Sequence, residues 1–192
     1  MNLFDEHPAC KRIAGQVIVQ PLDGRWNGYS LYDSIFHLQQ TDYVKKGYCV
    51  TANLAVRKSV FDAVGGFSEE AFSGGDKQWN LRATSAGVPI QYDREMSVLH
   101  PARETLGECA KKRRRIAGAW FYSDPNRPFR KKMPRLRRIF PSLRACTKIW
   151  RSPHPVGVGT RLGAMWCHYA VGLAYNVELA RLLISGGTPN RS

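Results

Sequence analysis

Residues 51–103 read TANLAVRKSVFDAVGGFSEEAFSGGDKQWNLRATSAGVPIQYDREMSVLHPAR, and the elements that they predict indicate the class of the fold. Residues 51–57 predict a short buried strand because they are mainly apolar and include β-branched side chains. Ser59 then predicts the start of a helical turn, SVFDAV, which Gly65-Gly66 should close. A strand followed directly by a helix is therefore the first unit of structure.

The second half of the stretch predicts a helix followed by strands. A helix is expected over residues 76–86, and Gly87-Val88-Pro89 should stop it. The segments PIQYD and MSVLH are then expected as two short strands on either side of a turn at Asp93-Arg94. Because helix and strand alternate, the sequence predicts an α/β fold.

The alternation extends towards the N-terminus and stops towards the C-terminus. Residues 13–20 have the β-branched content of a strand, and residues 29–40 place apolar side chains at helical spacing. Beyond Arg103 the expected elements are helices at 103–120, 135–149 and 160–184, with a basic linker at 124–134. We therefore expect an α/β part at residues 1–103 and a basic helical extension at residues 104–192.

The glycine-rich loop before the second helix precedes a candidate catalytic group. Ser73-Gly74-Gly75 lets the backbone approach a ligand closely, and Asp76 is expected at the helix N-terminus. The helix dipole and the backbone N–H groups there favour an ionised carboxylate, which can accept a proton at neutral pH. On spacing alone, the commoner role of such a residue is a helix cap.

The order of motifs in this region resembles the acceptor half of family 2 glycosyltransferases, which are inverting enzymes of GT-A fold. The motifs are a strand with an asparagine, an arginine followed by F-x-x-V-G-G-F, then G-G-D, a helix arginine and H-P-x-R. They comprise Asn53, Arg57, Phe61, Val64, Gly65, Gly66, Phe67, Gly74, Gly75, Asp76, Arg82, His100, Pro101 and Arg103. The resemblance covers about residues 10–120 and implies a partial GT-A domain.

This resemblance implies a role for several residues. Asp76 matches the general base that takes the proton from an acceptor hydroxyl while that oxygen attacks the anomeric carbon of the donor sugar. The residues expected to contact substrate are Asn53, Gly74, Gly75, Trp79 and Arg82. Trp79 is expected to offer an apolar platform for a sugar face, and Arg82 either neutralises a phosphate or pairs with a neighbouring carboxylate.

The resemblance also implies a divalent cation. Enzymes of this family hold Mg²⁺ or Mn²⁺ through a D-x-D motif, which neutralises the diphosphate leaving group, and no D-x-D occurs in these 192 residues. His100 occupies the place where some relatives supply an extra metal ligand, although a lone histidine there is more often structural. We therefore expect the C-terminal portion of a glycosyltransferase, truncated or partial, without the nucleotide-binding half.

The net charge of +14 is concentrated in one segment. Residues 111–151 hold fifteen Lys and Arg against one acid, Asp124, so the rest of the chain is neutral. This segment adjoins the apolar final helix, and together they predict a region that binds peripherally to membranes with anionic lipid. The aromatic side chains and leucine expected to enter the interface are Trp150, Trp166, Tyr169 and Leu173. A solvated basic face and nucleic-acid binding are the alternatives.

The favoured function is transfer of a sugar from a nucleotide sugar to a saccharide or lipid-linked acceptor at the cytoplasmic face of the cell membrane. A non-catalytic remnant or acceptor-binding module is the first alternative, and a basic nucleic-acid-binding protein is the second. Five cysteines without C-x-x-C spacing imply neither a disulfide framework nor a zinc site, and they fit a reducing cytoplasm. The first residues, MNLFDEHPACKR, lack the pattern of a secretory signal.

Overall fold

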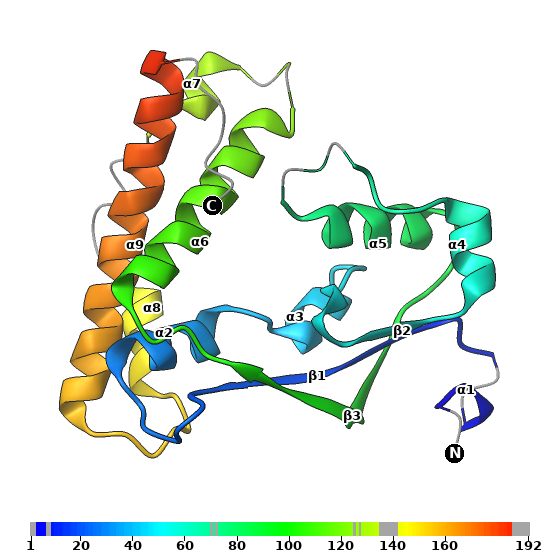
Figure 1. The fold of residues 1–192 in the computed structure, drawn as a ribbon, viewed down its shortest axis with the longest axis horizontal. Coiled ribbons are helices and arrows are strands. Elements are labelled where there is room, and N and C mark those ends of the chain that lie inside the picture. Colours follow the sequence, from blue (N-terminus) through cyan, green and yellow to red (C-terminus); the bar gives the residue numbers. More distant parts are fainter. Residues whose placement is uncertain are drawn as a thin grey trace. The chain divides into compact units, whose positions relative to one another are not determined.

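The computed structural model describes residues 3–6, 9–69, 71, 73–124, 126, 128–134 and 142–185. The chain divides into two compact units, whose elements are coloured along the sequence in Figure 1. Unit 1 comprises residues 1–19 and 38–100, and unit 2 comprises residues 20–37 and 101–192. We expected residues 20–37 in the first part of the chain, whereas in the structure they belong with the C-terminal helices.

In the described part of unit 1, three strands form a sheet in the order β2-β1-β3. The strands are β1 (Arg12–Gln20), β2 (Leu54–Val56) and β3 (Gln91–Pro101). β1 and β2 pair antiparallel, with Arg12 opposite Val56 and Ala14 opposite Leu54. The strand predicted from the β-branched residues 13–20 is thus confirmed, and it lies at the centre of this sheet.

The prediction of two short strands at 89–93 and 96–100 is wrong. These residues form the continuous strand β3, and the side chain of Asp93 accepts a hydrogen bond from the backbone N–H of Glu95 at 2.8 Å within it. β3 lies at the edge of the sheet, where polar side chains reach solvent. Charged residues in the middle of the segment therefore do not interrupt the strand.

Unit 1 has a small apolar core between two of its helices. The helices of the unit are α1 (Leu3–Glu6), α3 (Gln40–Val44), a 3-10 turn (Thr51–Asn53), α4 (Lys58–Val64) and α5 (Gly75–Ser85). Val60, Trp79 and Ala83 form the buried core, which joins α4 to α5. Gly65 ends α4 with a φ of 81°, as the Gly65-Gly66 pair predicted, because this backbone conformation favours glycine.

Unit 2 is mainly helical in its described residues. Its elements are α2 (Gly28–Phe36), α6 (Leu106–Tyr122), α7 (Phe129–Lys132), α8 (Leu143–Trp150) and α9 (Val158–Ser185). α2, α6 and α8 pack on α9, and their buried side chains include Leu31, Ile149 and Val171. α2 approaches α9 so closely that a Cβ at Gly28 would lie 2.4 Å from the carbonyl carbon of Gly163.

Capping side chains fix where α2 and α6 begin. Asn27 precedes α2, and its side-chain oxygen accepts hydrogen bonds from the backbone N–H groups of Tyr29 and Ser30, both at 2.9 Å. Thr105 and Glu108 form a reciprocal capping box at the start of α6. Asn27 also donates from Nδ2 to the carbonyl of Glu104 at 3.1 Å, which joins the starts of the two helices.

One helix prediction differs from the structure, and another covers residues that the structure does not describe. The helix expected over residues 29–40 ends at Phe36, because His37 is extended and Leu38 has a φ of 55°, and α3 begins separately at Gln40. For the helix expected over residues 135–149, residues 135–141 lie outside the described residues, and α8 begins at Leu143.

The long last helix was predicted over residues 160–184, and α9 confirms it with bounds Val158–Ser185. Its sequence includes Arg161, Glu178 and Arg181 as well as apolar side chains. Among the described helices, none combines the length and the hydropathy that a membrane span requires.

Three histidines of unit 2, one buried and two partly buried, should make the protein sensitive to mild acid. Burial lowers the pKa of His37, His154 and His168. The unfolded chain therefore binds more protons than the folded chain between each lowered pKa and the ordinary value of about 6.5, so stability falls as the pH drops through that window. We expect the thermal midpoint, followed by circular dichroism, to fall from about pH 7 to about pH 5.5. The thermal midpoint of the double variant His154→Gln/His168→Gln should fall less steeply with pH. An unchanged dependence on pH would show that these histidines do not cause the loss of stability.

Candidate active site

Asp76 lies in the first turn of α5, directly after the glycine loop. Gly74 occupies the cap position in the left-handed conformation, with φ 81° and ψ 21°, which favours glycine. Asp76 Oδ1 accepts a hydrogen bond from the backbone N–H of Lys77 at 2.8 Å. The capping position therefore belongs to Gly74, and Asp76 sits where the dipole of α5 stabilises negative charge.

A stack of side chains lies beside Asp76. The rings of Tyr43 and Tyr48 are stacked with their centroids 5.1 Å apart, and the ammonium of Lys77 lies 5.0 Å from the Tyr48 ring centroid. Burial raises the pKa of both tyrosines, and the Asp76 carboxylate also raises it. Burial likewise raises the pKa of the Cys49 thiol to about 12. The surroundings of Asp76 are therefore aromatic and cationic.

Hydrogen bonds hold α5 against the segment that carries these tyrosines. Asn80 Nδ2 donates to the carbonyl of Cys49 at 3.3 Å and to that of Asp76 at 2.9 Å. One turn later, the hydroxyl of Thr84 donates to the carbonyl of Gly47 at 2.6 Å. The first turn of α5 and the tyrosine pair are thus fixed relative to each other within unit 1.

The guanidinium of Arg12 ties α5 to the sheet from inside the core. Arg12 is 0% exposed, and its Nη1 donates to the backbone oxygen of Asn80 at 2.8 Å and to Asn80 Oδ1 at 2.9 Å. Its Nη2 donates to the hydroxyl of Thr84 at 2.8 Å and to the carbonyl of Val88. Burial lowers the pKa of Arg12. Sequence reasoning missed this residue, although a charged side chain opening an apolar strand was a usable signal.

Trp79 does not fit the expected role of a sugar platform. Its side chain is 0% exposed, and its ring stacks on that of Phe61 with the centroids 4.5 Å apart. Its indole N–H donates to the carbonyl of Gly65 at 2.7 Å. Because Trp79 is buried, neither face of its ring is open to a sugar. It anchors α5 to the end of α4 instead.

The other expected substrate-binding side chains contact backbone groups. Asn53 is 6% exposed, and its Nδ2 donates to the carbonyls of Gln16 in β1 and Met96 in β3, at 2.8 and 2.9 Å. Arg82 is exposed and donates from Nη2 to the carbonyl of Gly66 at 2.6 Å. The structure therefore brings Gly74, Gly75 and Asp76 together, whereas Asn53 joins strands.

The metal-ligand role of His100 has no support from the neighbouring side chains. His100 lies in β3 and is partly buried. Within the described ranges, no group of three or more His, Cys, Asp or Glu side chains lies close enough together to hold a metal ion. The described residues therefore do not fit the Mg²⁺ or Mn²⁺ site that the resemblance implies.

A buried ion cluster in unit 2 explains the arginine of the H-P-x-R motif. Asp33 is 0% exposed, and Arg103 Nη1 donates to its two oxygens at 3.0 and 3.1 Å. His37 Nδ1 lies 2.7 Å from Asp33 Oδ1, and Lys112 Nζ lies 3.8 Å from it. Burial alone would raise the pKa of Asp33, but the hydrogen bond from His37 and the nearby cations hold it well below its usual range. The cluster joins α2 to α6.

Comparison with known proteins gives one partial match of significance. The chain is 38% identical over 86 residues to glycosyltransferase AglE of Haloferax volcanii. The match covers 44% of this chain and spans 28% of the length of that relative. No protein-family model matches the chain.

Proposed function

We propose that this chain takes part in glycosyl transfer as the acceptor side of a family 2-type glycosyltransferase of GT-A fold. The observation that carries the proposal is the 38% identity over 86 residues with a protein named as a glycosyltransferase. The mixed α/β arrangement of unit 1 is consistent with part of such a domain. Asp76 at the start of α5, behind a glycine loop, is the residue to which the proposal gives the chemistry.

The proposed reaction is a single displacement. Asp76 accepts the proton of an acceptor hydroxyl while the hydroxyl oxygen forms a bond to the anomeric carbon of the donor sugar. The bond from that carbon to the diphosphate oxygen breaks, and its electron pair leaves with the nucleoside diphosphate. Attack opposite the leaving group inverts the anomeric centre. The donor in this proposal is a nucleotide sugar, and the acceptor is a saccharide or a lipid-linked sugar.

The local structure supports a positioned base beside open space. Among the described residues, a Cβ at Gly74 would meet no atom within 4 Å, which leaves room for a ligand against the loop backbone. Arg12, Asn80 and Thr84 hold α5 in place through the hydrogen bonds described above. A base fixed in this way loses little entropy when the acceptor binds.

An acceptor-binding module without catalysis is the second candidate. It is favoured by the absence of D-x-D from the sequence and of a cluster of potential metal ligands from the described residues. This candidate keeps the glycine loop and α5 as a saccharide-binding surface. It differs from the first in predicting that Asp76 makes no contribution to turnover.

A chimera tests the proposal. In AglE of Haloferax volcanii, the segment aligned with this chain is replaced by this chain, and release of nucleoside diphosphate from nucleotide sugars is measured with and without acceptor. Acceptor-dependent release above that of AglE lacking the segment is the expected result. A folded chimera that binds the donor and releases no diphosphate in the presence of acceptor would favour the acceptor-binding module.

A further inference from the structure

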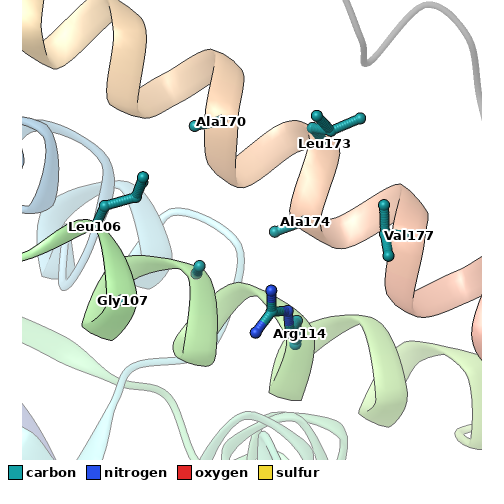
Figure 2. A pocket seen from close by; sticks show the side chains of 8 residues that line it. Leu106, Gly107, Arg114, Ala170, Leu173, Ala174 and Val177 are labelled. Carbon is teal, nitrogen blue, oxygen red and sulfur yellow. The ribbon is translucent and has the colours of Figure 1, made fainter.

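Helices α6 and α9 of unit 2 line an open groove of about 420 Å³, shown in Figure 2. This volume lies within the range of small-molecule sites. The groove is hollow because small residues form part of its wall: Gly107, Ala110, Ala170 and Ala174. Leu106, Leu173 and Val177 line the rest, and Arg114 is the charged residue among those that line it. The groove is thus apolar with one cation.

An exposed apolar stripe on α9 continues from this groove. Its members are spaced by four or seven residues and so share one face of the helix: Val158, Leu162, Trp166, Leu173, Val177 and Ile184. Each of them is between 39% and 88% exposed, whereas Cys167, Val171 and Leu179 on the other side of α9 are buried. Exposed apolar faces of this kind mark sites that contact proteins or membranes.

Positive charge lies on the helices that pack beside α9. The exposed cations described on α6 and α8 are Lys111, Arg114, Arg115, Arg144 and Lys148. Of the acids on α2, α6, α8 and α9, Asp33 and Glu178 are buried and paired with arginines, whereas Glu108 is exposed in the first turn of α6 and takes part in its capping box. The partner of this surface must therefore offer negative charge together with hydrocarbon.

We infer that the groove between α6 and α9 binds an anionic membrane lipid, with a hydrocarbon chain in the groove and the phosphate on Arg114. A guanidinium suits this role because it can donate two parallel hydrogen bonds to phosphate oxygens. The stripe of α9 then enters the interface between headgroups and acyl chains. This inference is independent of glycosyl transfer.

Two other occupants match the surface less well. A second copy of the chain carries the same net charge of +14, and the like charges repel. A nucleic acid supplies phosphate but offers no hydrocarbon chain for the groove or the apolar stripe. The positive charge and the apolar side chains of this surface together match an anionic lipid, which offers both a phosphate and hydrocarbon.

Vesicle binding by the full chain is the first test. Co-sedimentation is measured with vesicles of phosphatidylcholine alone and with vesicles that also contain phosphatidylglycerol, at low and high salt. We expect strong binding to the anionic vesicles, weaker binding in high salt, and little binding to neutral vesicles. Equal binding to both kinds of vesicle, or binding to neither, would overturn the inference.

A pair of matched variants tests the stripe. Val177→Asp places a carboxylate in the stripe, whereas Leu143→Asp makes the same change of charge at a leucine of α8 that is 86% exposed and lies outside the stripe. We expect at least about tenfold weaker partitioning for Val177→Asp, because apolar burial is lost and a charge must be desolvated. The partitioning of Leu143→Asp onto anionic vesicles should stay within about fivefold of that of the wild type. Similar losses for the two variants would overturn the role of the stripe.

The groove itself is tested by a second pair of variants and by a filling variant. Arg114→Gln and Arg115→Gln remove the same charge from neighbouring positions of α6, so general attraction predicts a loss of about fivefold for each. We expect Arg114→Gln to lose more than about tenfold if phosphate sits on that side chain. Gly107→Leu has room to fold, since the nearest atom to a Cβ there is 3.9 Å away, and it should weaken binding by filling the groove. Equal losses of vesicle binding for Arg114→Gln and Arg115→Gln, together with full binding by Gly107→Leu, would overturn the inference that lipid binds in the groove.

Self-association is measured in parallel by sedimentation equilibrium without lipid. A monomer that binds anionic vesicles supports the lipid site. A dimer that Val177→Asp dissociates, without vesicle binding by the wild type, assigns the stripe to a second copy of the chain and overturns the inference. Circular dichroism of each variant establishes that the helices are retained.

Discussion

Asp33→Asn is expected to lower the free energy of unfolding of unit 2 by about 3–5 kcal/mol. Asn keeps the volume of the side chain but removes the negative charge that compensates Arg103 and Lys112. Because Asp33 is fully buried, water does not replace the lost carboxylate, and the facing cations are left without their counter-charge. The loss comes from uncompensated charge, which costs more than a missing hydrogen bond between neutral groups.

Urea unfolding followed by tryptophan fluorescence measures this effect. Four of the five tryptophans, Trp26, Trp120, Trp150 and Trp166, belong to unit 2, so the signal reports mainly on that unit. Asp23→Asn is the matched control, because Asp23 is an exposed acid of the same unit. It should change stability by less than about 1 kcal/mol. Equal losses for the two variants would show that the cluster is not the cause.

The dependence on pH adds a second readout for Asp33. Its pKa is lowered in the folded state, so its contribution to stability is present above the ordinary carboxyl value of about 4 and is lost as the pH falls towards the folded-state pKa. The difference in the free energy of unfolding between the wild type and Asp33→Asn should therefore become smaller below about pH 4. A difference that stays constant with falling pH would argue against an electrostatic origin.

Local sequence patterns predicted the elements that depend on nearby residues. The β-branched run of β1, the glycines that end α4 and the apolar spacing of α9 each act over a few positions, and all three elements appear as expected. The glycine loop before Asp76 also follows from local rules, since Gly74 takes the left-handed conformation at the start of α5. These features form because their causes lie within one or two turns of chain.

Contacts between distant residues could not be predicted in the same way. Asp33 and Arg103 are separated by 70 positions, and Arg12 and Asn80 by 68. Trp79 follows the glycine loop at a spacing suited to a ligand, yet it is buried because α4 supplies Phe61 and the Gly65 carbonyl. A single carboxylate inside the apolar segment SLYDSIF was a signal of a buried partner, but the sequence does not identify that partner.

Asp76→Asn is expected to reduce turnover of the chimera with AglE by about 10² to 10⁴-fold, the usual contribution of a general base. The amide keeps the size of the side chain and an oxygen that can accept the hydrogen bond from the backbone N–H of Lys77. The start of α5 should therefore remain folded, because Asn is also tolerated in the first turn of a helix. The variant loses the proton acceptor, so the acceptor hydroxyl must attack without assistance.

The comparison is made at saturating donor, with circular dichroism of both proteins and Asp62→Asn as the control for an exposed acid of unit 1. A lower kcat with little change in the KM for the acceptor is the signature of lost proton transfer, since binding contacts remain. A raised KM with unchanged kcat would show instead that Asp76 binds the acceptor without acting as a base. Asp76 lies beside Tyr48 and Lys77 on a helix that Arg12 holds, so loss of the carboxylate should leave its surroundings in place.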